Sequence, residues 1–162
     1  MISGVLLIDK PAGLTSHDVV ARVRRVSGQR KVGHTGTLDP FATGLLLVAL
    51  GAATKNIKYT HDWPKEYEAT VTLGAISTTD DPEGELTKQA DGSAPTEAAV
   101  QATLSSFLGE QRQVPPAFSA KKIDGERAYK KMRRGERVVL APHIITIHEL
   151  ELLTYQYPEL SL

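Results

Sequence analysis

The stretch GHTGTLDPFATG, residues 33–44, comes directly before the apolar run LLLVAL and is unusually rich in glycine and polar side chains. Its glycines stand at positions 33, 36 and 44, where they permit positive φ angles or close approach of a ligand. The polar side chains between them are His34, Thr35, Thr37, Asp39 and Thr43. A loop of this composition between regular elements is a candidate binding or catalytic site.

Asp39 also has a purely structural interpretation. An aspartate followed by a proline, here Pro40, is typical of a helix start, with the aspartate as N-cap and the proline at the first helical position. Local chemistry alone favours this interpretation. A metal site formed by His34 and Asp39 is weaker, because no third ligand stands nearby in the sequence. A phosphate-binding loop is not indicated, since the Gly-Lys-Ser/Thr ending of the Walker pattern is missing.

The segments around this loop predict alternating strands and helices. The apolar run Gly4–Ile8 predicts a buried strand, and a helix follows with Ser16 as its N-cap and Gly28 at its end. The valines expected on its inward face are Val19, Val20, Val23 and Val26. Further elements are a buried strand at Leu45–Leu50, a short helix at Ala52–Tyr59, a half-buried strand at Tyr67–Leu73, a helix from the cap Thr96 to Leu108, a basic helix at Glu126–Arg134 and a strand at Ile144–Leu153. This order, without a regular βαβ rhythm, predicts an α+β domain with a largely antiparallel sheet.

The net charge of zero is the sum of segregated blocks. Residues 1–58 hold eight Lys or Arg against three Asp or Glu, whereas residues 59–110 hold two against ten. Residues 111–140 are basic again, with nine against three. Local basic surface determines phosphate affinity, so these blocks are compatible with RNA binding, although solvated helix faces explain them equally well on charge alone.

Composition excludes several classes of protein. The 162 residues contain no cysteine, which rules out disulfide frameworks, cysteine zinc sites and thiol nucleophiles. There is no apolar run of 18 residues, and the N-terminal apolar stretch reaches Asp9 and Lys10 too early for a signal peptide. We expect a soluble, cytoplasmic protein that has no contact with membranes.

Five segments of the chain, in order, resemble the TruB family of tRNA pseudouridine synthases. They are Gly4–Pro11 with Gly13 and Ser16, then GHTGTLDPFATGLL, Ala53–Lys55, Lys65–Tyr67 and VPPAFSAKKIDGERAY. The resemblance implies the pseudouridine synthase catalytic fold, a mixed and largely antiparallel sheet with flanking helices. It also implies isomerisation of a T-loop uridine in tRNA, with no metal and no organic cofactor. DNA is not an expected partner, and a monomer is expected.

The resemblance also implies which residues form the site. Asp39 matches the essential aspartate of the family, which acts as a nucleophile at the ribose, as a nucleophile at the uracil ring, or as a base that removes a ribose proton. Tyr67 matches the tyrosine that stacks on the flipped base, and His34 matches a histidine beside the flipped nucleotide.

A basic segment at residues 114–136 matches the thumb-like RNA-binding insertion of the family. The residues expected to contact the RNA backbone are Lys121, Lys122, Arg127, Lys130 and Lys131, with Arg133 and Arg134 after them. Residues 1–162 thus correspond to the N-terminal part of the catalytic domain, incomplete at its C-terminus. The Lys-Gly-x-Tyr-x-Arg motif of the family, whose arginine pairs with the catalytic aspartate, does not occur in the sequence, and neither does the C-terminal RNA-binding domain. We therefore expect this chain to be crippled as an isolated enzyme, without robust turnover.

Three other functions are kept as alternatives. A guide-RNA-dependent pseudouridine synthase shares the aspartate loop, although the amino-acid sequence of residues 33–44 favours the stand-alone bacterial type. A non-catalytic tRNA-binding or tRNA-folding module would not need the arginine motif, because it does not depend on an ionised catalytic aspartate. An aspartate-dependent hydrolase would need a second acid or base at a defined separation, and the sequence indicates none.

Overall fold

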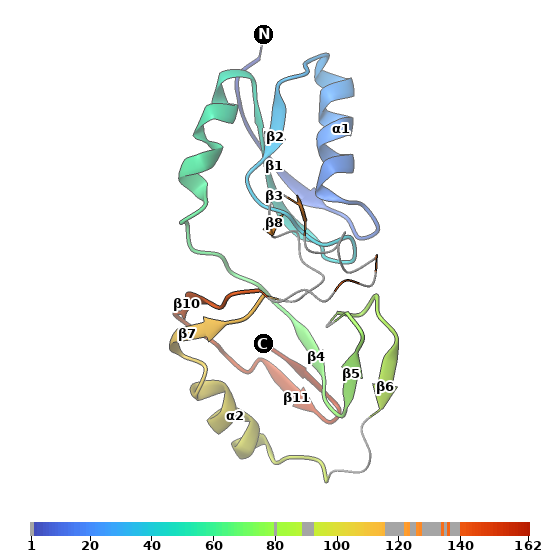
Figure 1. Cartoon of the computed structure of the whole chain (residues 1–162), viewed down its shortest axis with the longest axis vertical. Helices are drawn as coiled ribbons and strands as arrows, with labels where there is room; N and C mark the ends of the chain where they lie inside the picture. Colours follow the sequence, from blue (N-terminus) through green and yellow to red (C-terminus); the bar gives the residue numbers. More distant parts are fainter. Residues whose placement is uncertain are drawn as a thin grey trace. The chain divides into compact units, whose positions relative to one another are not determined.

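The computed structural model describes residues 2–79, 81–88, 93–115, 122–123, 126–127, 134, 136 and 140–162 (Figure 1). The chain forms two compact units, residues 1–66 and 67–162. Both combine helices with strands, and every strand pair in the described ranges is antiparallel. The predicted α+β class with largely antiparallel pairing is confirmed, with the strands distributed over several small sheets.

The first unit is a three-stranded sheet with helices on either side of it (Figure 1). Its elements are β1 (Gly4–Lys10), α1 (Ser16–Ser27), β2 (Val32–His34), β3 (Gly44–Leu50) and the 3-10 helix η1 (Gly51–Thr60). The strand order is β1-β3-β2, so β3 is central. Because His34 pairs with Val48 and Lys10 pairs with Gly44, the loop between β2 and β3 lies at the same end of the sheet as the end of β1.

The core of this unit lies between α1 and the strands β2 and β3. It consists of Val19, Val20, Val32, Leu46, Val48 and Leu50. The valine face of α1 is confirmed for Val19 and Val20, and Val23 packs partly against the core. It is wrong for Val26, which is 86% exposed and does not belong to the core.

The prediction of a buried first strand is correct for the strand and wrong for its burial. Leu7 is 73% exposed and Val5 is half exposed, while Ile8 packs partly against the core. The physical reason is that side chains alternate along β1: Ile8 lies on the face of the sheet that carries the core residue Leu46, whereas Val5 and Leu7 lie on the opposite face.

The N-cap of helix α1 lies one residue earlier than the sequence predicted. The N-cap is Thr15, whose hydroxyl accepts from the Asp18 amide at 3.1 Å while the Asp18 carboxylate accepts from the Thr15 amide at 2.9 Å. These hydrogen bonds from Thr15, side chain first, lower the pKa of Asp18. Ser16 is therefore released from capping and its hydroxyl is used elsewhere. The predicted end at Gly28 is confirmed, with φ of +66°.

The second unit contains short strands and one helix. Its elements are β4 (Thr70–Thr72), β5 (Ala75–Ser77), β6 (Leu86–Lys88), α2 (Glu97–Ser105), β7 (Gly109–Gln113), β8 (Lys122–Ile123), β9 (Glu126–Arg127), β10 (His143–Ile147), β11 (Thr154–Gln156) and β12 (Glu159–Ser161). The sheets are β11-β12-β4, β10-β7, β5-β6 and β8-β9. Thr96 caps α2 as predicted, by accepting from the Ala99 amide, but the helix ends at Ser105 rather than at Leu108.

Three strand and helix predictions in this unit need correction. The strand expected at residues 67–73 is limited to β4, because its partner β12 is only three residues long. The strand expected at residues 144–153 ends early, since β10 stops at Ile147 and the next strand, β11, begins only at Thr154. The basic helix expected from Glu126 does not begin there, since Glu126 and Arg127 form β9; residues 128–133 lie outside the described residues.

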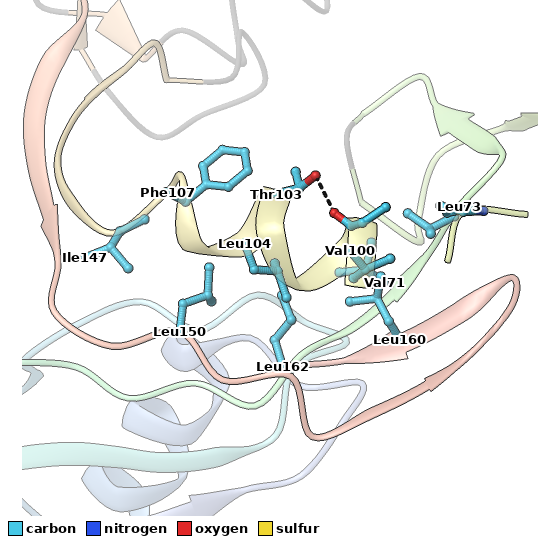
Figure 2. A pocket seen from close by; sticks show the side chains of 12 residues that line it. Val71, Leu73, Val100, Thr103, Leu104, Phe107, Ile147, Leu150, Leu160 and Leu162 are labelled. Carbon is cyan, nitrogen blue, oxygen red and sulfur yellow. Dashed lines mark hydrogen bonds between the residues drawn. The ribbon is translucent and has the colours of Figure 1, made fainter. Parts of the chain in front are cut away.

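An apolar groove of about 570 Å³ runs along α2 in the second unit (Figure 2). Val100 and Leu104 line it from the helix, and Leu160 and Leu162 line it from the other side. The hydroxyl of Thr103 is satisfied by the Ala99 carbonyl oxygen at 2.9 Å. With no ionisable side chain in its lining, the groove offers no group for acid-base chemistry or phosphate binding.

Candidate active site around Asp39

Asp39 lies in the loop that joins the paired strands β2 and β3. The Thr35 amide donates to the Leu47 carbonyl at 3.0 Å, and the Ala42 amide donates to the Asp39 carbonyl at 3.1 Å. Residues 37–43 contain no helix, so the interpretation of Asp39 as a helix N-cap is wrong. An Asp-Pro pair is equally compatible with a turn inside a loop, and here the hydrogen bond from the Ala42 amide to the Asp39 carbonyl closes such a turn.

Leu38, the residue before Asp39, is held by Ser16 of α1. The Ser16 hydroxyl donates to the Leu38 carbonyl at 3.2 Å and accepts from the Leu38 amide at 2.9 Å. Ser16 is 2% exposed, so both hydrogen bonds lie in the interior of the unit. This pairing replaces the backbone partner that an irregular segment otherwise lacks.

Pro40, the residue after Asp39, is held by the turn that follows β1. Its carbonyl oxygen accepts from the Gly13 amide at 2.8 Å and from the Lys10 ammonium at 3.3 Å. Lys10 is completely buried, and its ammonium group also donates to the carbonyls of Pro11 and Leu14. All three donors of the ammonium group therefore have carbonyl acceptors. Sequence reasoning gave no site role to Lys10, because a buried lysine without a carboxylate partner has no sequence signature.

Both neighbours of Asp39 are thus fixed while its own side chain is exposed. Among the residues that the structure describes, the Asp39 carboxylate accepts no hydrogen bond. The fixed backbone therefore sets the direction of its Cα–Cβ bond, while no contact among the described residues sets its side-chain torsions. An exposed carboxylate on a fixed backbone can act on a molecule brought to it from solution, as a nucleophile or as a proton acceptor.

His34 ends β2 and is half-buried. Burial is the largest cause that lowers its pKa, the nearby His17 lowers it further, and a hydrogen bond with the Gly36 backbone opposes both. The rings of His17 and His34 meet edge to face, with centroids 5.4 Å apart. Nδ1 of His34 is buried and has no partner among the described residues. The neutral imidazole is therefore favoured near pH 7.

The three glycines of the loop have different reasons for being glycine. Gly44 has φ of +110°, which side chains rarely adopt, so the expected positive φ is found there. At Gly33 a Cβ atom would lie 3.1 Å from Cδ1 of Ile57, which is a close approach within the protein. Gly36 has open space around it.

The remaining predicted site residues belong to the second unit. Tyr67 is its first residue and is 68% exposed. Lys122 and Arg127 pair across the hairpin β8-β9, whereas Lys121, Lys130 and Lys131 lie outside the described residues. Arg134 forms an exposed ion pair with Glu136 at 2.8 Å. In the described part of the chain, no three His, Asp or Glu side chains come together as a metal site, and no helix is long and apolar enough to cross a membrane.

Comparison with known proteins places the chain in a defined class of proteins. Residues 24–162 match the model of the TruB family pseudouridylate synthase N-terminal domain. Similar solved structures are those of a Cbf5-Nop10-Gar1 complex, with 27% identity and a TM-score of 0.65, and of an H/ACA RNP bound to a substrate RNA, with 26% identity and a TM-score of 0.64. The chain is covered to 98% in both comparisons, and it covers 37% and 36% of those chains. The fold is therefore that of pseudouridine synthases.

The sequence relatives narrow the class to a family. The chain is 51% identical over 155 residues to tRNA pseudouridine synthase B of Leifsonia xyli and 52% identical over 149 residues to that of Thermobifida fusca. These alignments cover 94% and 92% of the chain. The chain belongs to the TruB family of pseudouridine synthases. It spans about half the length of these relatives, 51% in each case.

Proposed function

We propose that this chain is the N-terminal part of the catalytic domain of an enzyme that converts a uridine in the T-loop of tRNA to pseudouridine. Membership of the TruB family and relatives named tRNA pseudouridine synthase B support this assignment. The observation that carries it is the placement of Asp39, an exposed carboxylate between two residues whose backbones are fixed by Ser16 and Lys10. We expect the enzyme to act as a monomer in the cytoplasm.

The reaction requires a carboxylate and a site that confines the uracil base while it turns. It involves no change of oxidation state. The bond between uracil N1 and the ribose breaks, the base turns, and the ribose bonds to C5, which gives up its proton while N1 takes up a proton from solvent. Uridine and pseudouridine are isomers, so no electron donor or acceptor is needed. Asp39 acts at the ribose, at the uracil ring or on a ribose proton, and all three roles need an ionised carboxylate held near the sugar.

The other site residues act on the RNA. A base within a folded loop has to be flipped out before it can react, and Tyr67 supplies an exposed aromatic ring on which the flipped base stacks. His34, with its lowered pKa, contacts the nucleotide as a neutral imidazole. The basic segment 114–136 closes on the T-loop through Lys121, Lys122, Arg127, Lys130 and Lys131, by neutralising phosphates.

The test uses T-stem-loop RNA labelled with tritium at C5 of its uridines. The sequence lacks the Lys-Gly-x-Tyr-x-Arg motif, so Asp39 has no arginine from that motif to stabilise its charge, and we expect slow turnover. Release of tritium is therefore measured with the chain in excess over RNA. The wild-type chain should release label in a single turnover, and Asp39→Asn should release none above the rate without protein. Equal release by both chains would refute the role of Asp39.

Two outcomes distinguish the alternative functions. RNA binding without any release would identify a tRNA-binding or tRNA-folding module. Release that depends on an added guide RNA would identify a guide-dependent synthase, as in the H/ACA complexes to which the fold is similar. The higher identity to the stand-alone tRNA enzymes, 51% against 26%, favours release without a guide.

A further inference from the structure

The first turn of α1 contacts the candidate site through two consecutive residues. Ser16 makes two hydrogen bonds with the backbone of Leu38, at 2.9 and 3.2 Å, across 22 residues of sequence. The next residue, His17, meets the ring of His34 edge to face. This turn thus contacts the neighbour of Asp39 and the second site residue of the same unit.

Ser16 is not required for the helix in which it lies. Thr15 and Asp18 form the complete capping box, so the N-terminal amides are satisfied without the Ser16 hydroxyl. The packing of α1 on the sheet comes from Val19 and Val20. The buried hydroxyl of Ser16 is therefore committed to the loop of Asp39 and to nothing else among the described residues.

We propose that Ser16 is a positioning residue for Asp39, an inference that rests on the proposed function. A hydroxyl can donate to the Leu38 carbonyl and accept from the Leu38 amide at the same time, which fixes the peptide groups on both sides of Leu38. The second of these peptide groups leads directly into Asp39. Since the carboxylate has no hydrogen bond of its own among the described residues, this constraint on the backbone fixes where its Cβ atom lies and so limits the positions the carboxylate can reach.

The test compares Ser16→Ala with Ser27→Ala in the 162-residue chain. Ser27 lies at the other end of α1, and its hydroxyl donates to the Val23 carbonyl at 2.7 Å, so its removal deletes a hydroxyl from the same helix without affecting the loop. The first readout is amide hydrogen exchange by NMR. Exchange at Leu38 should become about tenfold faster in Ser16→Ala, because its amide loses its acceptor, and stay unchanged in Ser27→Ala.

The second readout separates positioning from RNA binding. In the tritium assay, Ser16→Ala should lower the single-turnover rate constant by roughly 10- to 100-fold, as expected for a displaced catalytic group, while the Kd for the T-stem-loop changes less than twofold. Ser27→Ala should leave both values within twofold of wild type. A role of Ser16 in stability alone would lower the free energy of unfolding of Ser16→Ala and would not affect the rate constant at RNA saturation.

The outcomes distinguish this inference from the proposed function. If Asp39→Asn retains the wild-type rate, the proposed function fails. If Asp39→Asn is inactive but Ser16→Ala behaves as Ser27→Ala does, only the positioning role fails. If the chain has no measurable turnover, the hydrogen-exchange rate of the Leu38 amide is the deciding measurement. An unchanged rate in Ser16→Ala would overturn the inference.

Discussion

The ammonium group of Lys10 donates a hydrogen bond to the carbonyl oxygen of Pro40, 30 residues later in the chain, over 3.3 Å. The same group donates to Pro11 and Leu14, so one completely buried side chain joins the turn after β1 to the loop of Asp39. Lysine is rarely buried in this way unless its charge is compensated, and here carbonyl dipoles replace a carboxylate.

Replacing Lys10 by methionine should destabilise the first unit. Methionine fills a similar volume but removes the ammonium donor from the carbonyls of Pro11 and Leu14 and leaves that of Pro40 with the Gly13 amide alone, which should lower the free energy of unfolding by about 2–3 kcal/mol. Urea denaturation followed by circular dichroism measures this change. Lys58→Met is the control, because Lys58 is exposed and lies over the ring of Tyr59. Equal midpoints for the two variants would contradict the structural role of Lys10.

A pair of glycines separates backbone strain from steric overlap. Gly51 and Gly28 have similar φ angles, +58° and +66°, but a Cβ atom at Gly51 would lie 2.5 Å from the Ile2 carbonyl oxygen, whereas the space around Gly28 is open. Gly28→Ala should cost about 1–2 kcal/mol through its left-handed conformation, and Gly51→Ala about 3 kcal/mol or more, since overlap is added. Thermal unfolding of both variants checks the order. A smaller loss at Gly51 would show that Ile2 and Ser3, which precede β1, move away without cost.

The sequence predicted the type of most elements because their determinants are local. Gly28 stops α1 and Thr96 caps α2 as expected, since both depend on a few neighbouring residues. Burial was predicted less well, because it depends on distant partners. Leu7 is exposed although it stands in an apolar run, since it lies on the face of β1 that points away from the core, whereas its neighbour Ile8 packs against the core.

For the candidate site, the loop was recognisable but its support was not. Local chemistry favoured Asp39 as a helix cap, and the family resemblance pointed to catalysis instead. Ser16 was interpreted as a cap, because a serine before a helical pattern has the same sequence signature whether its hydroxyl bonds its own helix or a loop 22 residues away. Only the three-dimensional structure shows which of these hydrogen bonds is made.

Val26 of α1 and Val48 of β3 test which apolar side chains belong to the core. Val48 is completely buried, and Val48→Ala should lower the free energy of unfolding by about 2 kcal/mol through lost burial and a residual cavity. Val26→Ala should change it by less than about 0.5 kcal/mol, because that side chain is 86% exposed. Denaturant unfolding of the two variants measures both values. A loss at Val26 comparable to that at Val48 would restore the prediction, made from the sequence, that Val26 lies on the inward face.

The lowered pKa of His34 predicts a dependence of stability on pH. Burial lowers this pKa below the ordinary value of about 6.5, so in the window between the two values the unfolded chain binds more protons than the folded chain. The contribution of His34 to stability is therefore fully present above about pH 6.5 and is lost as the pH falls through that window. His34→Gln should remove this dependence. The free energy of unfolding of wild type, relative to that of the variant, should therefore increase as the pH rises from about 5 to about 7.5. This range extends roughly one pH unit or more to each side of the ordinary pKa of about 6.5.

NMR titration of the His34 ring gives the direct measurement. His17→Ala should raise the pKa of His34, because it removes a neighbouring positive charge, while most of the lowering should remain, since burial is its largest cause. His61→Ala is the matched control, because His61 is an exposed histidine of the same unit. It should leave the His34 titration unchanged. A pKa of His34 at or above its ordinary value in the wild-type chain would contradict the burial of this ring, and with it the neutral imidazole proposed to contact the RNA.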